Sequence, residues 1–276
     1  MMISYDNGEY AYTDQITISV DNLAYNRSFG VFDFMRMEDG VVLFLNDYLQ
    51  RFQDSQKLLF EVAPFGNANL RDIISTLIEL NKLKESTFKF ILSANIVDGK
   101  IKPHLVVLNA AYQEYSQEYF TKGTSLLEQE YVREFAEYKT LNYMASFQNY
   151  ERLQKNNAVD VLFHKKNQVS EASRSNIFMI KKGKIFTAQN DILNGITRKA
   201  IMRGFTGSLK VIVKNITYKE LLNADELFVS STLKKVMPIV KVGDRKIGDG
   251  KVGPVTQKAI ERFAVICQEY VRKTVE

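Results

Sequence analysis

The amino-acid sequence predicts an α+β fold in two domains. The chain has 276 residues, about twice the common size of a single domain. Patterns typical of strands and of amphipathic helices alternate along its whole length, without an internal repeat or a low-complexity tract. A composition of 45% hydrophobic and 25% charged residues is that of a globular protein and excludes a disordered chain, collagen or a coiled coil.

The predicted first domain, residues 1–112, is the smaller one. It begins with two hairpins, over 2–12 with the turn Asp6-Asn7-Gly8 and over 31–45 with the turn Glu38-Asp39-Gly40. Asn46 is the predicted N-cap of the helix that follows, and apolar residues at helical spacing predict a second helix over 69–83. Strands over 87–97 and 101–108, joined by Asp98-Gly99, complete this domain.

The predicted second domain covers residues 113–276, because the polar stretch 109–123 has neither helical nor strand periodicity and is the natural boundary. A helix is predicted over 143–155, with Met144, Phe147 and Tyr150 on one face. The later pattern predicts strands over 159–164, 176–181, 185–188 and 226–230, a helix from Ile196, a β-rich segment over 210–217, a short helix over 218–223 and a last helix that Pro254 opens.

Charge and composition exclude several classes of function. The net charge is +5, and the cations are dispersed along the chain, so we expect no nucleic-acid partner. The densest cluster of lysines, Lys181 to Lys184, lies in a predicted hairpin turn. The excess of positive charge equally suits a small anionic ligand. Two separated histidines and the single Cys267 predict no metal site and fit a reducing compartment. Short apolar stretches and the lack of a secretion signal predict a cytoplasmic protein without a membrane span.

Three segments of the second half carry the chemistry. They read Lys139-Thr140-Leu141-Asn142-Tyr143, then Glu171-Ala172-Ser173-Arg174-Ser175-Asn176-Ile177-Phe178, then Asn194-Gly195-Ile196-Thr197-Arg198. In this order and spacing they resemble the class IV aminotransferases, the fold-type IV enzymes that use pyridoxal 5′-phosphate (PLP). Further matches extend the resemblance over residues 28–270, at 31–36, 49–52, 228–238 and 253–256.

The resemblance implies a role for each of these segments. PLP chemistry needs an amine that holds the cofactor as a Schiff base, and Lys139 matches the family's lysine. It also needs an anionic group facing the pyridine nitrogen, the role of the family's glutamate at the position of Glu171. Tyr143 matches the tyrosine beside the phenolic oxygen, and Asn176 a position in the cofactor shell. Without the resemblance, a surface lysine and a solvent-facing glutamate are the other interpretations.

A phosphate site is the third requirement. Gly195-Ile196-Thr197 precedes a helical pattern, so the amides of Ile196 and Thr197 can point at an anion. Ser231 and Thr232 offer hydroxyls and amides in a turn, although the same residues also suit helix capping. The resemblance implies that Arg51, on the first-domain helix, reaches the phosphate.

The substrate side departs from the family. Many members carry an Arg-x-x-x-Thr-Arg-Gly pattern on a first-domain strand, where an arginine binds the substrate carboxylate. Here the strand reads Lys89 to Asn95, with Ala94 at the position of that arginine. Lys89 keeps a positive charge, as a point charge rather than a fork, and Arg174 is a second candidate for anion binding. Arg27, Lys102 and His104 are further candidates nearby.

The sequence thus predicts an aminotransferase resembling the branched-chain or D-amino-acid enzymes, which moves an amino group between an amino acid and a 2-oxo acid. A 4-amino-4-deoxychorismate lyase, releasing pyruvate and 4-aminobenzoate, is the alternative within the family. A PLP-binding homologue with weak or no catalysis is a third hypothesis. The resemblance also implies a homodimer, and the apolar residues Phe29, Phe32, Phe34 and Met144 favour a neutral, hydrophobic amino donor.

Overall fold

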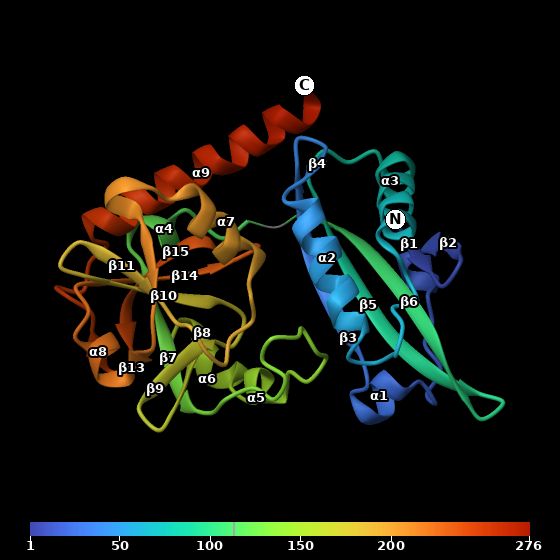
Figure 1. Cartoon of the computed structure of the whole chain (residues 1–276), viewed down its shortest axis with the longest axis horizontal. Coiled ribbons are helices and arrows are strands. Elements are labelled where there is room, and N and C mark those ends of the chain that lie inside the picture. The colour runs from blue at the N-terminus through green and yellow to red at the C-terminus, as the bar shows by residue number, and fades with distance from the viewer. Residues whose placement is uncertain (113) are drawn as a thin grey trace. The chain divides into compact units, whose positions relative to one another are not determined.

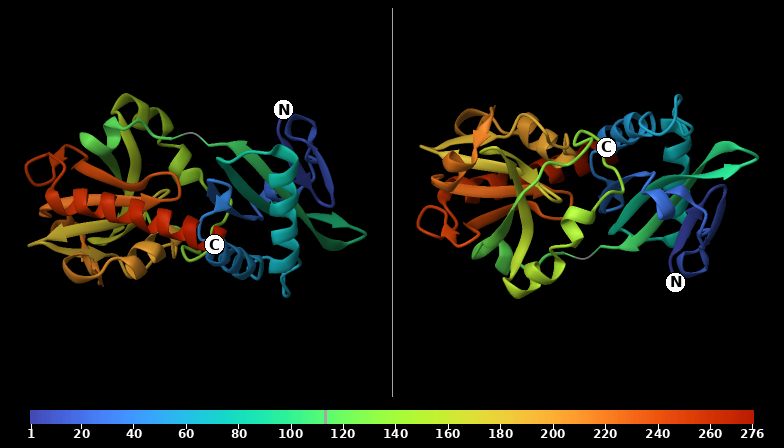
Figure 2. Two further views of the ribbon diagram at one scale, coloured as in Figure 1. Left: turned by 90° about the horizontal axis from the view of Figure 1, so that it is seen from above. Right: turned by 90° about the horizontal axis from the view of Figure 1, so that it is seen from below.

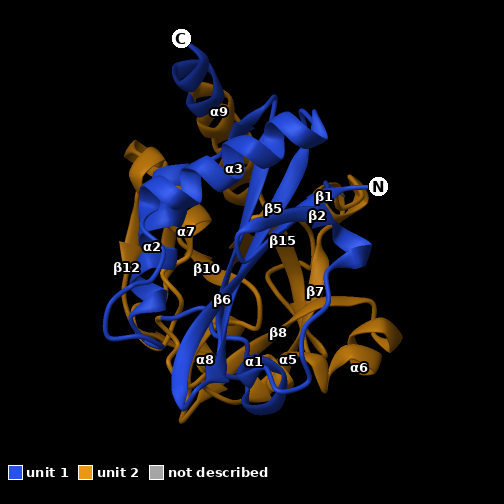
Figure 3. Cartoon of the chain, turned by 90° about the vertical axis from the view of Figure 1, so that its right-hand side faces the viewer, with its two compact units in different colours: residues 1–113, 138–142, 270–276 blue, residues 114–137, 143–269 orange. Residues whose placement is uncertain are grey.

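The computed structural model describes residues 1–112 and 114–276. Gln113, where the predicted second domain begins, lies outside the described residues. The described residues form two compact units (Figure 3): the first holds 1–112, 138–142 and 270–276, and the second holds 114–137 and 143–269. The segment that contains Lys139 thus groups with the first unit. Helices and strands alternate throughout, and the α+β prediction is confirmed (Figure 1).

The first unit is built on one antiparallel sheet with the strand order β2-β1-β6-β5-β3-β4. The β5–β6 pair is its longest ribbon, and Figure 2 shows its turn projecting beyond the rest of the sheet. Alternation of apolar residues explains the strands, because each second residue faces the core. The strands are β1 (Ile3–Asp6), β2 (Glu9–Tyr12), β3 (Val31–Glu38), β4 (Val41–Val42), β5 (Ser86–Val97) and β6 (Lys100–Ala111).

Helices α2 and α3 pack on this sheet, with α2 contacting β3 and α3 contacting β1. Both are amphipathic: α3 buries the apolar residues predicted at helical spacing and ends at Lys82 in a left-handed conformation. The predicted N-cap of α2 is wrong, because the helix begins after Phe44 and the Asn46 side chain instead accepts a hydrogen bond from Arg71. The helices are α1 (Leu23–Arg27), α2 (Leu45–Gln56) and α3 (Asn67–Asn81), with a 3₁₀ turn at Thr13–Gln15.

The second unit is built on a mixed ten-stranded sheet with the order β12-β11-β10-β14-β15-β7-β8-β9-β13, and β16 pairs with β15. One apolar cluster of its core includes Leu162, Ile177, Leu227 and Met237, and a second, smaller cluster holds Leu127, Leu153, Val161 and Phe163. The strands are β7 (Thr124–Glu130), β8 (Ala158–Lys165), β9 (Gln168–Ala172), β10 (Asn176–Lys181), β11 (Lys184–Thr187), β12 (Val211–Val213), β13 (Ile216–Thr217), β14 (Glu226–Ser231), β15 (Lys235–Val242) and β16 (Arg245–Lys246).

The helices of the second unit are α4 (Glu118–Thr121), α5 (Met144–Phe147), α6 (Tyr150–Lys155), α7 (Ile196–Gly204), α8 (Tyr218–Leu222) and α9 (Pro254–Val275), with a 3₁₀ turn at Gly207–Leu209. Pro254 opens α9 as predicted, and the Glu226 carboxylate accepts hydrogen bonds from the amides of Val255 and Thr256. None of the helices in the described part of the chain combines the length and apolar character that a membrane crossing requires.

Several predicted elements need correction. The single helix over 143–155 is two short helices, α5 and α6. The residues on the predicted apolar face, Met144, Phe147 and Tyr150, are exposed, whereas Ser146, Asn149 and Leu153 are buried. The segment 210–217 contains two short strands, and the strand over 41–45 ends at Val42. Strands β7, β9, β15 and β16 and the short helices α1 and α4 are additional to the prediction.

Candidate active site

The segment that carries Lys139 lies beside the start of β3. The amide of Phe32 donates to the Lys139 carbonyl at 2.8 Å, the amide of Leu141 donates to the Gly30 carbonyl at 3.0 Å, and Val31 forms an antiparallel bridge with Thr140. A Cβ at Gly30 would collide with the Leu141 side chain, so glycine is what permits this close approach. Backbone hydrogen bonds therefore fix the position of Lys139 on the sheet of the first unit.

Lys89 and Lys139 lie against the same aromatic ring. The Nζ atoms of Lys139 and Lys89 are 4.3 and 5.4 Å from the centroid of the Phe32 ring. Lys89 lies on β5 opposite Phe34 of β3. Phe34 is two residues from Phe32, so both side chains lie on the same face of the sheet as Lys89. Burial lowers the pKa of Lys89, and the nearby charge of Lys139 lowers it further. The structure thus brings together the two lysines that the sequence singled out.

Arg51 binds a buried carboxylate of its own unit. From α2, its Nε and Nη2 atoms donate to Asp33 on β3 at 2.9 and 2.6 Å. The Asp33 side chain is fully buried, and the guanidinium also lies over the ring of Tyr48. This bidentate pair fixes the direction of the arginine. Its implied contact with the cofactor phosphate remains a prediction.

Glu171 is buried on β9 and has two partners in the second unit. Arg133 Nε donates to Oε1 at 2.7 Å, and the amide of Leu193 donates to Oε2 at 2.8 Å. Arg133 also donates to the Ala136 carbonyl. The sequence reasoning missed Arg133, because it lies 38 residues before Glu171 and no local motif marks it. The pair holds a negative carboxylate in one orientation, as an electrostatic partner of a pyridinium requires.

Asn176, the first residue of β10, joins Glu171 through the same loop. Its Nδ2 donates to the Leu193 carbonyl at 2.8 Å, so the two side chains hold both backbone groups of Leu193. Gly195 follows as the N-cap of α7, and a Cβ there would collide with Asn176 Oδ1. The loop is therefore pinned at the N-terminus of α7, where Ile196 and Thr197 are both buried.

The turn after β14 lies at the same end of β10. In the antiparallel β10–β14 pair, Asn176 is opposite Ser230, so their side chains share one face of the sheet. Ser231 and Thr232 follow directly, and Ser231 Oγ accepts from the amide of Lys234 at 3.3 Å. Ser230 is 2% exposed, and its Oγ has no hydrogen-bond partner among the described residues. The structure thus brings the predicted segments at 171–176, 195–197 and 231–232 to one end of β10.

A buried ion pair that the sequence reasoning missed supports this turn. Lys234 Nζ donates to Asp160 Oδ2 at 2.8 Å and contacts Ser175 Oγ at 3.0 Å. Asp160 on β8 also accepts from Ser173, Ser175 and the amide of Val161. Burial alone would raise the pKa of Asp160, but Lys234 and Arg174 outweigh it, so the pKa lies below its usual value. The pair ties the β14–β15 turn to the Ser173–Ser175 turn that follows Glu171.

The remaining substrate candidates occupy different settings. Arg174 is exposed and donates to the Val159 carbonyl at 3.4 Å. Ala94 is fully buried in β5, and the side chains of Ser93 and Asn95 on either side of it accept hydrogen bonds from Asn22, which caps α1. His104 pairs with Asp6 at 2.6 Å, and Arg27 donates to a backbone carbonyl. Tyr143 is the N-cap residue of α5.

The chemistry of the residues at this end of β10 fits PLP. The Ser230 hydroxyl, which has no hydrogen-bond partner among the described residues, is a donor suited to a phosphate dianion, as are the α7 amides next to Gly195 and the hydroxyls of Ser231 and Thr232. At the same end of β10, Glu171 is the buried carboxylate suited to a pyridinium nitrogen.

Comparisons with known proteins agree with this chemistry. The sequence model of the family described as amino-transferase class IV matches residues 30–242. A D-alanine aminotransferase of Listeria monocytogenes is 27% identical, covering 96% of this chain and 97% of its own, and one of Staphylococcus haemolyticus is 29% identical, covering 93% and 95%.

Solved structures share the fold. The branched-chain amino acid aminotransferase of Escherichia coli has a TM-score of 0.87 at 22% identity, covering 96% of this chain and 94% of its own. The T.th. branched-chain enzyme, solved with pyridoxamine 5′-phosphate, has a TM-score of 0.85 at 22% identity, covering 98% and 96%. The predicted two-domain, fold-type IV class is therefore confirmed. With the family matched over most of its length, the chain belongs to the class IV aminotransferases, enzymes that use PLP.

Proposed function

We propose that this enzyme transfers the amino group of a small, neutral D-amino acid to a 2-oxo acid, with Lys139 as the residue that binds PLP covalently. The observation that carries the proposal is the pair Lys139 and Lys89 on the Phe32 ring. One lysine is thereby available for the cofactor, and a second cation lies beside it for the substrate carboxylate. The D configuration is supported by the D-alanine aminotransferases that align with nearly the whole chain.

Bound PLP supplies an aldehyde that accepts the amino group and a pyridine ring that withdraws electrons. The Nζ of Lys139 would hold the cofactor at its aldehyde and would carry the α-proton as general acid and base. Glu171, oriented by Arg133, would place a negative charge against the ring nitrogen. Backbone hydrogen bonds position the Lys139 segment, and side-chain hydrogen bonds orient Glu171.

The phosphate is held by the donors at the end of β10. We assign it the amides of Ile196 and Thr197 and the hydroxyls of Ser231 and Thr232, with the Ser230 hydroxyl as an addition to the sequence prediction. Arg51 is assigned to the same phosphate on the resemblance to the family. Tyr143 and Asn176 complete the cofactor shell.

Lys89 is proposed as the carboxylate-binding residue, because Ala94 has no polar side chain. A lysine ammonium is a point charge without the fork geometry of arginine, so it demands less of the carboxylate's orientation. Arg174 is the second candidate, for a distal anionic group of the 2-oxo acid. We also propose a homodimer, as in the family, which sedimentation at working concentration would test.

Borohydride reduction tests the role of Lys139, with Lys89 as the matched control on the same ring. The wild-type holoenzyme and Lys89→Ala are expected to yield one peptide carrying reduced PLP, at residue 139. Lys139→Ala should give no such peptide and no turnover, with an unchanged circular dichroism spectrum. Reduced PLP on Lys89 in the wild type or in Lys139→Ala would contradict the assignment.

A substrate panel tests the reaction. It contains both enantiomers of alanine, leucine and glutamate, each with a 2-oxo acid, and aminodeoxychorismate alone. The proposal expects the highest kcat/KM for D-alanine. Preference for L-leucine would identify a branched-chain enzyme, and release of pyruvate and 4-aminobenzoate without a 2-oxo acid would identify the lyase; either result would overturn the proposal.

A further inference from the structure

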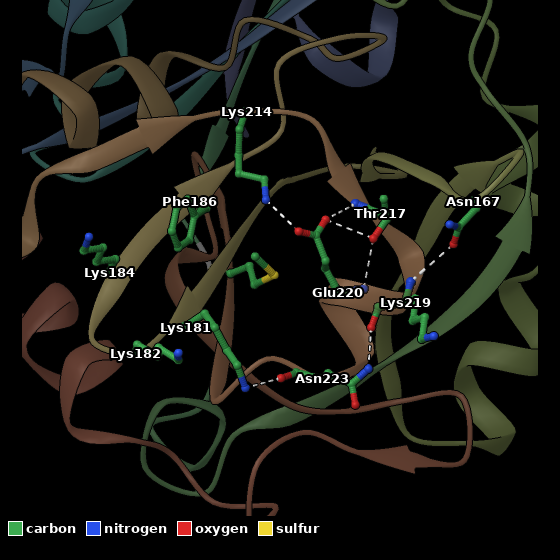
Figure 4. Close-up of a pocket in the computed structure, with 11 residues that line it drawn as sticks. Asn167, Lys181, Lys182, Lys184, Phe186, Lys214, Thr217, Lys219, Glu220 and Asn223 are labelled. Carbon is green, nitrogen blue, oxygen red and sulfur yellow. Dashed lines mark hydrogen bonds and ion pairs between the residues drawn. The ribbon is translucent and has the colours of Figure 1, made fainter.

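A basic pocket lies in the second unit, apart from the residues proposed to bind PLP. It has a volume of about 480 Å³, within the range of small-molecule sites. The β10–β11 hairpin forms one wall, and the segment from Lys214 to Asn223, with α8, forms the other (Figure 4). Five of its lining residues are lysines, namely Lys181, Lys182, Lys184, Lys214 and Lys219, and the one carboxylate that lines it is Glu220.

Carboxylates offset only part of this charge. Lys214 donates to Glu220 at 2.7 Å, and Lys181 donates to Asp225 at 2.7 Å. Lys182, Lys184 and Lys219 are exposed, and within the part of the chain that the structure describes their ammonium groups have no carboxylate partner. The Asp225 carboxylate accepts a hydrogen bond from the Lys182 amide at 2.7 Å and offsets part of that lysine's charge. The pocket still keeps an excess of positive charge, which favours an anionic occupant.

The floor of the pocket is apolar. Met179, which is 3% exposed, lines the pocket together with Phe186. Lys214 Nζ is 5.4 Å from the centroid of the Phe186 ring, so the aromatic residue lies where the charged rim begins. A thioether and an aromatic ring are good contacts for a flat ring system. An inorganic anion would leave this floor unused.

We propose that this pocket binds a small organic polyanion with an aromatic ring, of the nucleoside polyphosphate class. The ring lies on Met179 and Phe186, and the phosphates contact the ammonium groups of Lys182, Lys184 and Lys219. Lysine suits phosphate as a mobile point charge. The side-chain amides of Asn167 and Asn223 offer donors and acceptors for the polar edges of the ligand.

The pocket is separate from the proposed cofactor site within the same unit. Asn176, in that site, is the first residue of β10, and Lys181, in the pocket, is the last. They lie five residue steps apart along an extended strand, which corresponds to roughly 16 Å. Occupancy of both sites at once is therefore sterically possible, and the proposal is independent of the amino acid that the enzyme uses.

Calorimetric titration of the holoenzyme with ATP tests the proposal, after excess PLP has been removed by gel filtration. ATP is expected to bind saturably at one site per chain, more weakly as salt rises, while adenosine does not bind. Lys182→Gln/Lys184→Gln should weaken ATP binding about tenfold or more, because each lost charge removes a charge-assisted contact. The control Arg245→Gln/Lys246→Gln removes the same charge from another exposed pair in the same unit and should leave affinity nearly unchanged.

Binding of inorganic tripolyphosphate, which has no aromatic ring, distinguishes the proposed phosphate contacts from the proposed ring contacts. ATP should bind more tightly than tripolyphosphate, and Phe186→Leu should remove roughly five- to hundredfold of this advantage while leaving tripolyphosphate binding intact. Equal affinity for both would reduce the pocket to a simple anion site and overturn the proposal. Absence of saturable ATP binding, or equal weakening by the control variant, would overturn it as well.

Discussion

Lysine has two different settings in this enzyme. In the first unit, Lys89 lies on the Phe32 ring next to a second lysine, and burial together with that neighbour lowers its pKa. In the second unit, Lys234 is 3% exposed and donates to the fully buried Asp160. Burial lowers the pKa of both lysines, but the charge of Lys139 lowers that of Lys89 further, whereas the Asp160 carboxylate opposes the shift at Lys234.

The difference between these two settings distinguishes a lysine suited to binding a ligand from a lysine that stabilises the fold. A lysine beside another cation gains from an incoming anion, so Lys89 is suited to a carboxylate. Lys234 instead donates to Asp160, whose carboxylate also accepts hydrogen bonds from two hydroxyl groups and one backbone amide. Lys234 therefore positions the β14–β15 turn.

The largest expected effect comes from breaking the buried pair. Asp160→Ala and Lys234→Ala each leave one buried charge without its partner, and each should lower the free energy of unfolding by about 3–5 kcal/mol. The double variant Asp160→Leu/Lys234→Met removes both charges and should lose much less. Urea unfolding of the three proteins decides this, and single variants that lose under about 1 kcal/mol would show that the pair is not structural.

Acid unfolding sharpens the same comparison. Because the pKa of Asp160 is lowered by folding, its charged form contributes stability above the unfolded value of about 3.9, and this contribution is lost as pH falls through the folded pKa. The double variant should therefore show a weaker loss of stability below about pH 4 than the wild type. An identical pH dependence in urea unfolding would contradict this assignment.

The next effect concerns the rate. Glu171→Gln keeps an acceptor for the Leu193 amide but removes the negative charge, so PLP should still bind while kcat falls about a hundredfold, as for other positioned charges. Glu128→Gln on the exposed face of β7 is the matched control and should retain full activity. Unchanged turnover in Glu171→Gln would mean that the glutamate only fixes the loop at Leu193.

Local patterns predicted the parts of the fold that local forces determine. The α3 helix, the β5–β6 hairpin with its Asp98-Gly99 turn and the start of α9 at Pro254 follow from periodicity and turn chemistry. Strands β7 and β15 were missed, and they pair in parallel with each other, so their partners lie far along the chain. The spacing of Met144, Phe147 and Tyr150 correctly predicted helical structure, but these three side chains are exposed, so the spacing did not identify the buried face.

The candidate site residues also fall into those that local sequence patterns predict and those that only the tertiary structure identifies. Lys139, Glu171 and the Gly195 loop belong to contiguous motifs that the sequence displays, whereas Arg133 and Lys234 have no motif of their own. Lys234 belongs to a Lys-Lys pair that reads as a surface turn, and its burial depends on Asp160, 74 residues away. Only the tertiary structure places such partners together.

A smaller effect is expected at Lys89, in the substrate affinity. Lys89→Met should raise the KM for amino acids about tenfold, by losing a charge-assisted contact, while Lys89→Arg keeps a cation. Because the pKa of Lys89 is lowered, its charge disappears at a lower pH than that of an ordinary lysine. The wild-type KM should therefore rise with increasing pH before that of Lys89→Arg does. A KM for Lys89→Met equal to the wild type would refute the assignment.

The smallest effect is expected at the surface pair that contrasts with Asp160 and Lys234. The Lys214 and Glu220 side chains are 35% and 44% exposed, so water and salt screen their attraction, and Lys214→Met should cost at most about 1 kcal/mol. Lys214 is the largest cause that lowers the pKa of Glu220 to about 2, ahead of the capping hydrogen bonds of Thr217. The stability that Glu220 contributes is present above about pH 4.5 and is lost as pH falls toward 2.

Lys214→Met should make the pH dependence of stability between those values shallower without abolishing it, because the capping box with Thr217 remains. The difference between wild type and variant should also shrink in 1 M salt, where screening acts over about 3 Å. At the buried pair, salt should change the loss in Lys234→Ala very little, since no solvent ions reach it. Urea unfolding of both variants at low and high salt measures this, and equal salt sensitivity at the two sites would show that burial does not separate these ion pairs.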